Sequence, residues 1–411
     1  MELKKKVPEV RFKGFSGEWE EKIIGALCKE TFGGGTPSTS DPECWNGEIP
    51  WIQSSDLVEE KLSNILPRKW ISGKGLSTSA TKLVPENSIA IVTRVGVGKV
   101  AFIPFKYATS QDFLSLSKLT IDSWFAVFSI WNKLQSELYA VQGTSIKGIT
   151  KEELLFKKIN VPGDFPEQSR IGTWFQHLDQ LITLHQKKYN KLTNIKKAML
   201  EKMFPKNGAD VPEIRFEGFE GKWEEKRLGE IAEFCRGKGM NKEAVVDNGS
   251  YKCVLYGHLY TTYGMVINDV IYSTNKFDND MYLSRIGDVL IPCSDTTPTG
   301  LARATSIELD GVILGGDINI LRPNKQIDGS FLSYNINSNR YKLLPLIKGT
   351  TVRHIDNSEL KTVELYIAKD NREQKQIVQF FQKLDHLITL QQTQIDKLKN
   401  IKKACLEKMF V

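Results

Sequence analysis

The feature that most constrains this chain is an internal repeat. Residues 7–22 read VPEVRFKGFSGEWEEK and residues 211–226 read VPEIRFEGFEGKWEEK, which are identical at 12 of 16 positions. Further along, residues 167–204 match residues 373–410 at 24 of 38 positions. Two matches in the same order, separated by a nearly constant offset, indicate that the chain consists of two copies of one structural unit.

The segments between the repeated stretches, 23–166 and 227–372, have nearly equal lengths but little identity. They contain short β-branched runs such as NSIAIVT, KVAFIPF, GDVLIPCS and GVILGGDINIL, which Gly, Pro, Asn or Asp bound. Such runs predict strands joined by turns. We therefore expect two strand-rich units of the mixed α/β (α+β) class, with similar frames and diverged interiors.

The two 38-residue segments predict long helices. Apolar residues recur at alternating intervals of three and four, which is the spacing of a coiled-coil seam. Neither segment contains proline, so each helix can run for about 57 Å at about 1.5 Å per residue. The expected seam is Ile171, Phe175, Leu178, Ile182, Tyr189, Leu192, Ile195 and Met199 in the first helix and Ile377, Phe381, Leu384, Ile388, Ile395, Leu398, Ile401 and Cys405 in the second.

Two related units in one chain are expected to arrange themselves about a pseudo-twofold axis, as the subunits of homodimers do. Such an axis makes the two helices antiparallel and places the units at opposite ends of a two-helix rod. The expected divisions are a first unit at 1–166, a first helix at 167–204, a second unit at 205–372 and a second helix at 373–411.

The net charge of +7 falls on the predicted helices. Residues 167–204 carry seven Lys and Arg against three Asp and Glu, and residues 373–410 carry seven against four, which sums to the charge of the whole chain. The two strand-rich segments therefore balance. Either the helices expose a solvated basic face, or they meet phosphates or an acidic partner.

Motifs for catalysis are missing from the sequence. RVGVGKV at 94–100 lacks the first glycine of a phosphate-binding loop and has Val100 in place of Ser or Thr, so we interpret it as a glycine turn between two strands. The glycine-rich TFGGGTPSTS at 31–40 does not stand between a clear strand and a helix start. The six cysteines and five histidines have no metal-ligand spacing.

No apolar run is long enough for a membrane helix, and the first residues have no secretory signal. We therefore expect a cytoplasmic protein that keeps its thiols reduced and does not associate with a membrane.

Several sequence motifs, taken in their order along the chain, make it resemble the specificity (S) subunit of Type I restriction–modification systems. They are the paired openings, the stretch from GGTPS to WNGEIPWIQSSDL between Gly34 and Leu57, ATSQDF at 108–113, and the GT…EQ…LITL stretch that closes each half. The resemblance covers essentially the whole chain. It implies that each unit is a target recognition domain that reads one part of a bipartite, asymmetric site in double-stranded DNA.

The resemblance also implies partners. The helices fix the distance between the two parts of the site and dock two methyltransferase (M) subunits, and motor-nuclease (R) subunits join the complex. The chain itself is then not an enzyme and binds no cofactor or metal, because S-adenosylmethionine, ATP and magnesium belong to the partner subunits.

Polar side chains at strand ends and turns are the candidate DNA contacts. Arg94 and Gln111 rank first, because Arg forms bidentate hydrogen bonds with guanine and Gln with adenine. Lys147 and Arg353 follow matching Gly-Thr turns, which favours a scaffold or phosphate role. For every candidate, stabilisation of a turn is the alternative. The full set is Gln53, Ser54, Ser55, Asp56, Thr93, Arg94, Ser110, Gln111 and Lys147, followed by Tyr256, His258, Tyr260, Ser294, Asp295, Thr296, Thr297 and Arg353.

Two other functions stay open at this stage. The first is a self-contained DNA methyltransferase or nuclease with duplicated reading domains, although the sequence has neither a cofactor loop nor a catalytic carboxylate motif. The second is a coiled-coil adaptor that binds only proteins.

Overall fold

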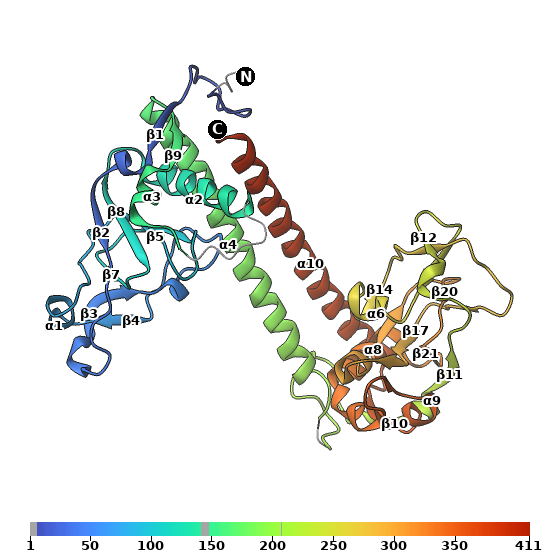
Figure 1. Cartoon of the computed structure of the whole chain (residues 1–411). Helices are drawn as coiled ribbons and strands as arrows, with labels where there is room; N and C mark the ends of the chain where they lie inside the picture. The colour runs from blue at the N-terminus through green and yellow to red at the C-terminus, as the bar shows by residue number, and fades with distance from the viewer. Residues whose placement is uncertain (1–5, 141–147, 207) are drawn as a thin grey trace. The chain divides into compact units, whose positions relative to one another are not determined.

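The computed structural model describes residues 6–140, 148–206 and 208–411 (Figure 1). The chain divides into two compact units. Unit 1 consists of Met1–Gln186 and Gln392–Val411, and unit 2 consists of Lys187–Gln391. The divisions fall inside the two longest helices, α4 (Phe165–Lys202) and α10 (Asn371–Lys408). Each unit therefore contains the first half of one long helix and the last half of the other.

Unit 1 is built on a four-stranded antiparallel sheet of order β2-β8-β5-β6, beside which the chain forms sheets of order β4-β3-β7 and β1-β9. Every residue of β5 and β6 is buried, because α2 packs on one face of these strands and an apolar cluster that includes Ile52 and Tyr107 packs on the other. The strands are β1 (Glu20–Ile23), β2 (Cys28–Gly33), β3 (Trp45–Ile52), β4 (Lys69–Ile71), β5 (Ser88–Val92), β6 (Val100–Ile103), β7 (Ala108–Thr109), β8 (Phe113–Leu119) and β9 (Lys158–Val161). The helices before α4 are α1 (Gly73–Ser77), α2 (Ser123–Ala140) and α3 (Lys151–Phe156).

Unit 2 has sheets of order β11-β21-β17-β19-β14, β12-β15-β13-β20-β16, β10-β23 and β18-β22. The strands are β10 (Glu224–Arg227), β11 (Ala232–Arg236), β12 (Val245–Val246), β13 (Tyr251–Val254), β14 (Val266–Ile267), β15 (Ser273–Thr274), β16 (Tyr282–Leu283), β17 (Asp288–Pro292), β18 (Ser294–Asp295), β19 (Thr305–Ile307), β20 (Ile313–Leu314), β21 (Ile318–Pro323), β22 (Arg353–His354) and β23 (Glu364–Ile367). The helices before α10 are α5 (Leu228–Ile231), α6 (His258–Thr261), α7 (Pro298–Leu301), α8 (Gly329–Ser338) and α9 (Asn357–Leu360).

The two units share one topology although their interiors differ in sequence. The antiparallel order β2-β8-β5-β6 corresponds to β11-β21-β17-β19, and the parallel pair β3-β7 corresponds to β13-β20. The closing pair β1-β9 corresponds to β10-β23. The expected mixed class of two tandem strand-rich units is confirmed. RVGVGKV forms the turn between the antiparallel strands β5 and β6.

The repeated opening sequence fastens the start of each long helix. In unit 1 the Arg11 guanidinium donates to both carboxylate oxygens of Glu167, at 2.7 and 2.8 Å, and to the carbonyl of Gly17. In unit 2 Arg215 makes the same bidentate pair with Glu373, at 2.7 and 2.9 Å. Both glutamates are only 1% exposed. A buried carboxylate requires such a partner, so the opening sequence and the helix start must be retained together.

The far end of each long helix completes the core of the other unit. After α4 ends at Lys202, Phe204 packs in unit 2 against Phe381, with ring centroids 6.0 Å apart. After α10, Phe410 packs in unit 1 against Phe175 at 5.5 Å. The periodicity predicts helices over 167–204 and 373–411, whereas both begin two residues earlier and stop at Lys202 and Lys408. The chain leaves the helix there because the following aromatic side chain turns into the core.

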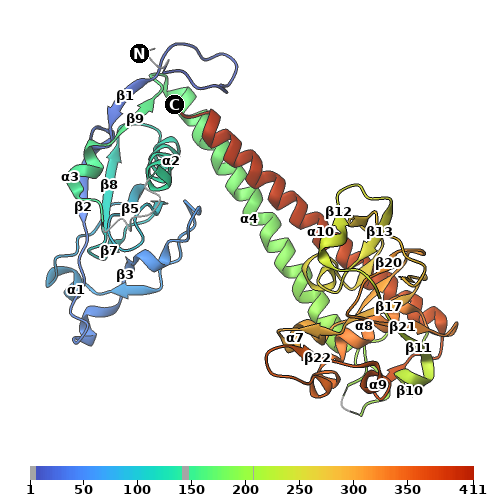
Figure 2. The same cartoon turned by 45° about the vertical axis from the view of Figure 1, so that its right-hand side comes forward.

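One ion pair in each unit sets the pairing of the two helices. In unit 1, which contains the first half of α4 and the last half of α10, Lys402 donates to Asp179 at 2.6 Å. In unit 2, Lys196 donates to Asp385, which also accepts from the Tyr334 hydroxyl. Together with the aromatic contacts, these pairs make the helix halves antiparallel in each unit (Figures 1 and 2).

The ion pairs are positioned alike because the lysine and the aspartate stand at matching places of the repeat. Lys402 also lies over the rings of Phe128 and Trp131, at 5.5 and 5.6 Å. Burial raises the pKa of the Asp179 carboxyl, and the charge of Lys402 opposes that shift. Of the expected seam residues, Ile171, Phe175, Leu178, Ile377, Phe381 and Leu384 are buried, Leu192 and Ile195 pack on the core of unit 2, Leu398 and Ile401 pack on the core of unit 1, and Ile182 and Ile388 are half-buried.

The substitution Arg11→Met tests the fastening of the helix start. It leaves the Glu167 carboxylate buried without its ion pair, which costs about 3–5 kcal/mol of unfolding free energy. Arg372→Met removes a bidentate pair with Asp370, but Arg372 is 85% exposed, so the unfolding free energy should stay nearly unchanged. Urea denaturation measures both. Equal losses in the two variants would contradict a structural role for the repeated opening.

Candidate functional site

The candidate residues fall on corresponding connections of the two units. Residues 53–56 follow β3, and residues 256–260 follow the equivalent strand β13. Residues 93–94 connect β5 to β6, and residues 294–297 connect β17 to β19. The pair 110–111 precedes β8. The polar residues of the two copies, although unlike in sequence, thus lie at the same edge of a shared framework.

In unit 1 the two candidates ranked first line one cavity. Arg94 and Gln111 are both exposed, and both border a cavity of about 1040 Å³, whose wall also includes Thr93, Asp112 and Gly148. Lys147 lies outside the described residues. The cavity therefore combines a guanidinium and a side-chain amide, which are the two groups that hydrogen-bond the edges of bases most specifically.

Thr93, in the wall of this cavity, and Ser110, behind it, are both buried. The Thr93 hydroxyl donates to the carbonyl oxygen of Asp112 at 3.1 Å, and the Ser110 hydroxyl donates to the Asp112 carboxylate at 3.2 Å. Thr93 is 8% exposed and Ser110 is 5% exposed. Their polar groups are satisfied within the protein, so they stabilise the turn that presents Gln111.

The stretch after β3 is a single 3₁₀ turn, Ser54–Asp56. The Asp56 carboxylate is buried, accepts a hydrogen bond from the backbone N–H of Gln53 at 2.9 Å and forms an ion pair with Arg68 at 3.4 Å. Gln53 and Ser54 are half-buried, and Ser55 is exposed. Asp56 therefore caps the turn, which leaves Ser55 as the residue of this stretch most open to a ligand.

In unit 2 a short strand pair brings candidates together from distant parts of the chain. β18 pairs with β22, which places Asp295 opposite Arg353. The Asp295 carboxylate accepts from the Thr296 amide at 2.6 Å and from the Thr297 hydroxyl at 3.1 Å, whereas Ser294 is buried. The Arg353 Nε is buried and has no hydrogen-bond partner among the described residues.

The tyrosines after β13 join this group, and the histidine does not. Tyr256 and Tyr260 contact edge to face at 6.3 Å. Burial raises the pKa of Tyr260, and the nearby charge of Asp295 raises it further. His258 instead accepts a hydrogen bond from the Leu255 amide at 3.1 Å and stacks on Tyr272 at 3.6 Å. Burial lowers the His258 pKa, and its ring belongs to the packing of the unit.

Sequence reasoning missed two residues on the edge of unit 1. The Thr36 hydroxyl donates to the Oε1 of Gln111 at 2.6 Å. Val95, next to Arg94, is 71% exposed at the tip of the turn between β5 and β6. The triple glycine before Thr36 was the available signal, because consecutive glycines permit a close backbone approach.

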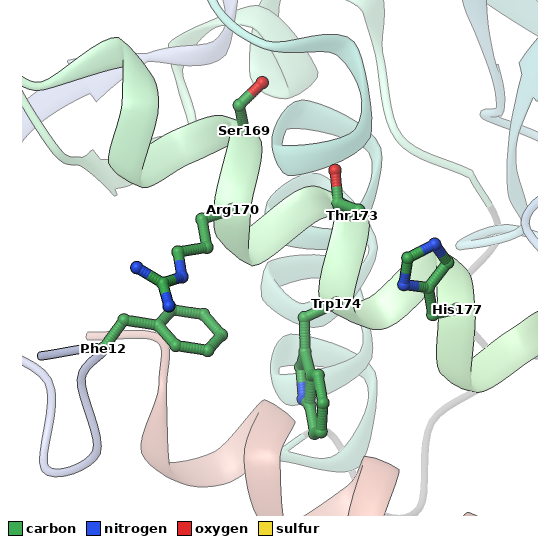
Figure 3. Close-up of a pocket in the computed structure, with 6 residues that line it drawn as sticks. All are labelled: Phe12, Ser169, Arg170, Thr173, Trp174 and His177. Atoms are coloured by element: carbon green, nitrogen blue, oxygen red, sulfur yellow. The ribbon is translucent and has the colours of Figure 1, made fainter.

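A second hollow, of about 540 Å³, lies on the frame of unit 1 and contains none of the candidates (Figure 3). The Arg170 guanidinium lies over the Phe12 ring at 4.9 Å, and Phe12 meets Trp174 edge to face at 6.3 Å. Unit 2 has the corresponding contact between Phe216 and Phe380, at 5.9 Å. Trp174 is 38% exposed. Both units therefore keep an aromatic pair at this position, although the packing of the core does not require an aromatic side chain there.

Over the described parts of the chain, no group of three or more His, Cys, Asp or Glu side chains could hold a metal ion. Within the same residues, no helix is long and apolar enough to cross a membrane.

Comparison with known proteins gives a match to both units. A family described as the Type I restriction modification DNA specificity domain matches residues 16–194 and again residues 220–400. The chain is 28% identical over 286 residues to the MjaIX Type I restriction enzyme specificity subunit of Methanocaldococcus jannaschii, which aligns 65% of this chain with 62% of that protein. It is 33% identical over 192 residues to the EcoR124I/EcoR124II specificity subunit of Escherichia coli, which aligns 42% of this chain with 46% of that protein. The chain thus spans less than two thirds of these relatives.

Two solved structures share the fold. The S subunit of a Type I restriction–modification system from M. genitalium superposes with a TM-score of 0.64 at 15% identity, over 98% of this chain and 99% of that one. A second structure comes from work on the complex assembly and conformational transition of the type I R-M system. One of its chains superposes with a TM-score of 0.51 at 17% identity, over 95% of this chain and 97% of that one.

Three substitutions separate the residues that build this edge from those that face outward. Asp56→Ala removes the buried carboxylate that pairs with the backbone N–H of Gln53 and with Arg68. We expect it to lower the unfolding free energy by about 1–3 kcal/mol. Arg94→Ala and Gln111→Ala change exposed side chains and should stay within about 0.5 kcal/mol. Chemical denaturation compares the three. A loss in Arg94→Ala as large as that in Asp56→Ala would assign Arg94 to the scaffold.

Proposed function

Because the chain belongs to the Type I restriction–modification DNA specificity family, we propose that it selects the DNA sequence on which a Type I restriction–modification complex acts. Each unit reads one part of a bipartite, asymmetric site in double-stranded DNA. The chain carries out no catalysis itself. Methylation and cleavage, with the S-adenosylmethionine, ATP and magnesium that they require, belong to partner subunits in the cytoplasm.

One observation carries this proposal. Corresponding connections of the two units present polar and charged side chains, but the residue types differ: an arginine and an amide in unit 1, and tyrosines, a carboxylate and an arginine in unit 2. A protein that binds two copies of one target would keep these residues alike. Reading two different base sequences through one framework requires that they differ, because each base pair offers its own pattern of donors and acceptors.

The charge distribution supports a requirement for partners. The two strand-rich segments carry almost no net charge, whereas DNA binding draws most of its affinity from contacts between basic groups and phosphates. We propose that two methyltransferase subunits supply part of that basic surface and that motor-nuclease subunits then join. The aromatic pairs Phe12–Trp174 and Phe216–Phe380 are equivalent on the two units, as docking of the same partner twice requires.

Exchange of residues 23–166 for the equivalent region of a relative tests the proposal. With methyltransferase subunits present, the exchanged chain should direct methylation to a site in which one part has changed and the other has not. Sequencing that detects methylated bases measures both parts at once. The chain without partners should transfer no methyl group and cut no DNA. Methylation by the chain alone would favour a self-contained methyltransferase, and a complex without DNA selectivity would favour a protein adaptor.

Lengthening both helices tests whether they set the spacing of the site. Adding seven residues near Asn190 and seven near Asp396 preserves the seam and leaves the pairs Asp179–Lys402 and Lys196–Asp385 in register. The insertions add about 10 Å at about 1.5 Å per residue, which is at most about three base pairs at about 3.4 Å each. We expect the same two half-sites with a longer gap, measured by methylation mapping.

The single insertions are the matched controls, since each shifts only one helix and should abolish assembly. Retained activity of the double insertion with an unchanged gap would mean that the partner subunits determine the spacing.

A further inference from the structure

The turn that presents Gln111 is fixed on both sides before any ligand arrives. On one side the Ser110 amide donates to the carbonyl of Ile52 at 3.0 Å, and the Phe113 amide donates to the carbonyl of Ser110 at 3.4 Å. On the other side Asp112 accepts the hydroxyls of Thr93 and Ser110. The backbone of residues 110–113 therefore has little freedom, and the orientation of the Gln111 side chain depends on its own contacts.

The glycine-rich stretch at 31–40 packs against this turn. A Cβ on Gly34 would lie 1.9 Å from the Ser110 carbonyl oxygen, and one on Gly35 would lie 2.4 Å from the Thr81 amide nitrogen. The Gly35 amide donates to the carbonyl of Thr109 at 2.9 Å, and its own carbonyl accepts from the Trp51 indole at 3.0 Å. Only glycines permit this approach, and they place Thr36 beside Gln111.

The bond between Thr36 and Gln111 then decides which atoms of the amide face outward. The Thr36 hydroxyl donates to Oε1 at 2.6 Å and occupies one of its two lone pairs. Among the described residues, no other side-chain hydrogen bond occupies the second lone pair of Oε1 or the hydrogens of Nε2. That outward edge matches adenine, whose N6 donates and whose N7 accepts in the major groove, and it mismatches guanine, which offers two acceptors there.

Resting on the proposed function, we propose that Thr36 is a positioning residue that orients the Gln111 amide to read one adenine. Without the hydroxyl, the long glutamine side chain would lose rotamer freedom only on binding, and this loss would weaken recognition. The hydrogen bond is solvent-exposed in the free protein. It strengthens when DNA covers the cavity and excludes water.

The second unit supplies an internal comparison. The strand pairs Gly33–Leu114 and Arg236–Asn319 occupy the same place in the two sheets, so Gly34 corresponds to Gly237. A Cβ on Gly237 would lie 2.0 Å from the Gly315 carbonyl, the same close approach as in unit 1.

By this register, the positions of Thr36 and Gln111 hold Gly239 and Gly316 in unit 2. The pair is present together in one unit and absent together in the other, while the glycine contact that frames it is kept. This is the pattern expected of a reading element that serves one half-site only.

Duplexes that carry the mapped target site, with each adenine replaced in turn by 7-deazaadenine, test the proposal in the complex with methyltransferase subunits. This replacement removes the N7 acceptor and preserves base pairing. The unsubstituted protein should lose affinity at one adenine of the half-site read by unit 1. Gln111→Ala should weaken binding to the natural site about 5- to 150-fold and should be insensitive to 7-deazaadenine at that adenine only.

Thr36→Val keeps the size of the side chain and removes the hydroxyl. We expect it to weaken binding about 3- to 10-fold, to reduce the effect of 7-deazaadenine at the same adenine, and to leave all other positions unchanged. Thr36→Ser should restore the natural behaviour. Ser38→Ala is the matched control, because Ser38 is exposed on the same loop and, among the described residues, its side chain hydrogen-bonds the Ser40 hydroxyl and not Gln111.

Three results would overturn the assignment: no adenine whose N7 matters in that half-site, effects of Gln111→Ala and 7-deazaadenine at different base pairs, or full discrimination in Thr36→Val. Thermal unfolding of each variant verifies that it is folded, as expected for exposed side chains. A complex that methylates no defined sequence would refute the proposed function itself. Site-specific methylation without the 7-deazaadenine effect would refute only the adenine assignment.

Discussion

The packing of each helix end into the opposite unit is the constraint on which the rest of this protein depends. Phe410 completes the aromatic core around Phe175 in unit 1, and Phe204 completes the core around Phe381 in unit 2. Full burial of a ring such as that of Phe204 stabilises a protein by roughly 1.5–3 kcal/mol. Neither unit can therefore be assembled from one continuous stretch of chain. The helices must run antiparallel in each unit, and their register is fixed, because a shift by one residue would separate Lys402 from Asp179.

This constraint separates the residues that must stay alike from those free to change. The helix starts, their partner arginines and the closing aromatic residues are common to both halves, because each must fit a partner at the matching position. The sheets need only apolar residues of suitable size facing inward, and many combinations satisfy that need. The strand connections need still less, since they face outward. The residue types accordingly differ between the edge that carries Arg94 and Gln111 in unit 1 and the edge that carries Asp295 and Arg353 in unit 2.

Much of the frame could be predicted, because periodicity and repetition are local properties of a sequence. The spacing of three and four identified Ile171 and Phe175 as inward-facing residues, and both are buried. The candidate site was predictable only as a region. Asp56, Ser110 and Gln111 all carry polar side chains near strand ends, but Asp56 and Ser110 are buried and bond within the protein, whereas Gln111 is exposed. Whether a polar side chain bonds within the protein or stays open to a ligand depends on partners that are distant in the sequence.

The sequence by itself determined that there are two units, that their class is mixed, and that two long helices connect them, because a repeat and a heptad pattern can be recognised without knowledge of contacts. Only the tertiary structure decided that Phe204 and Phe410 leave the helix and enter a core, since no local signal distinguishes an inward aromatic residue from a helical one. It also decided that Thr36 lies against Gln111. The two are 75 residues apart, and their meeting depends on how the glycines at 33–35 pass across a turn that other strands position.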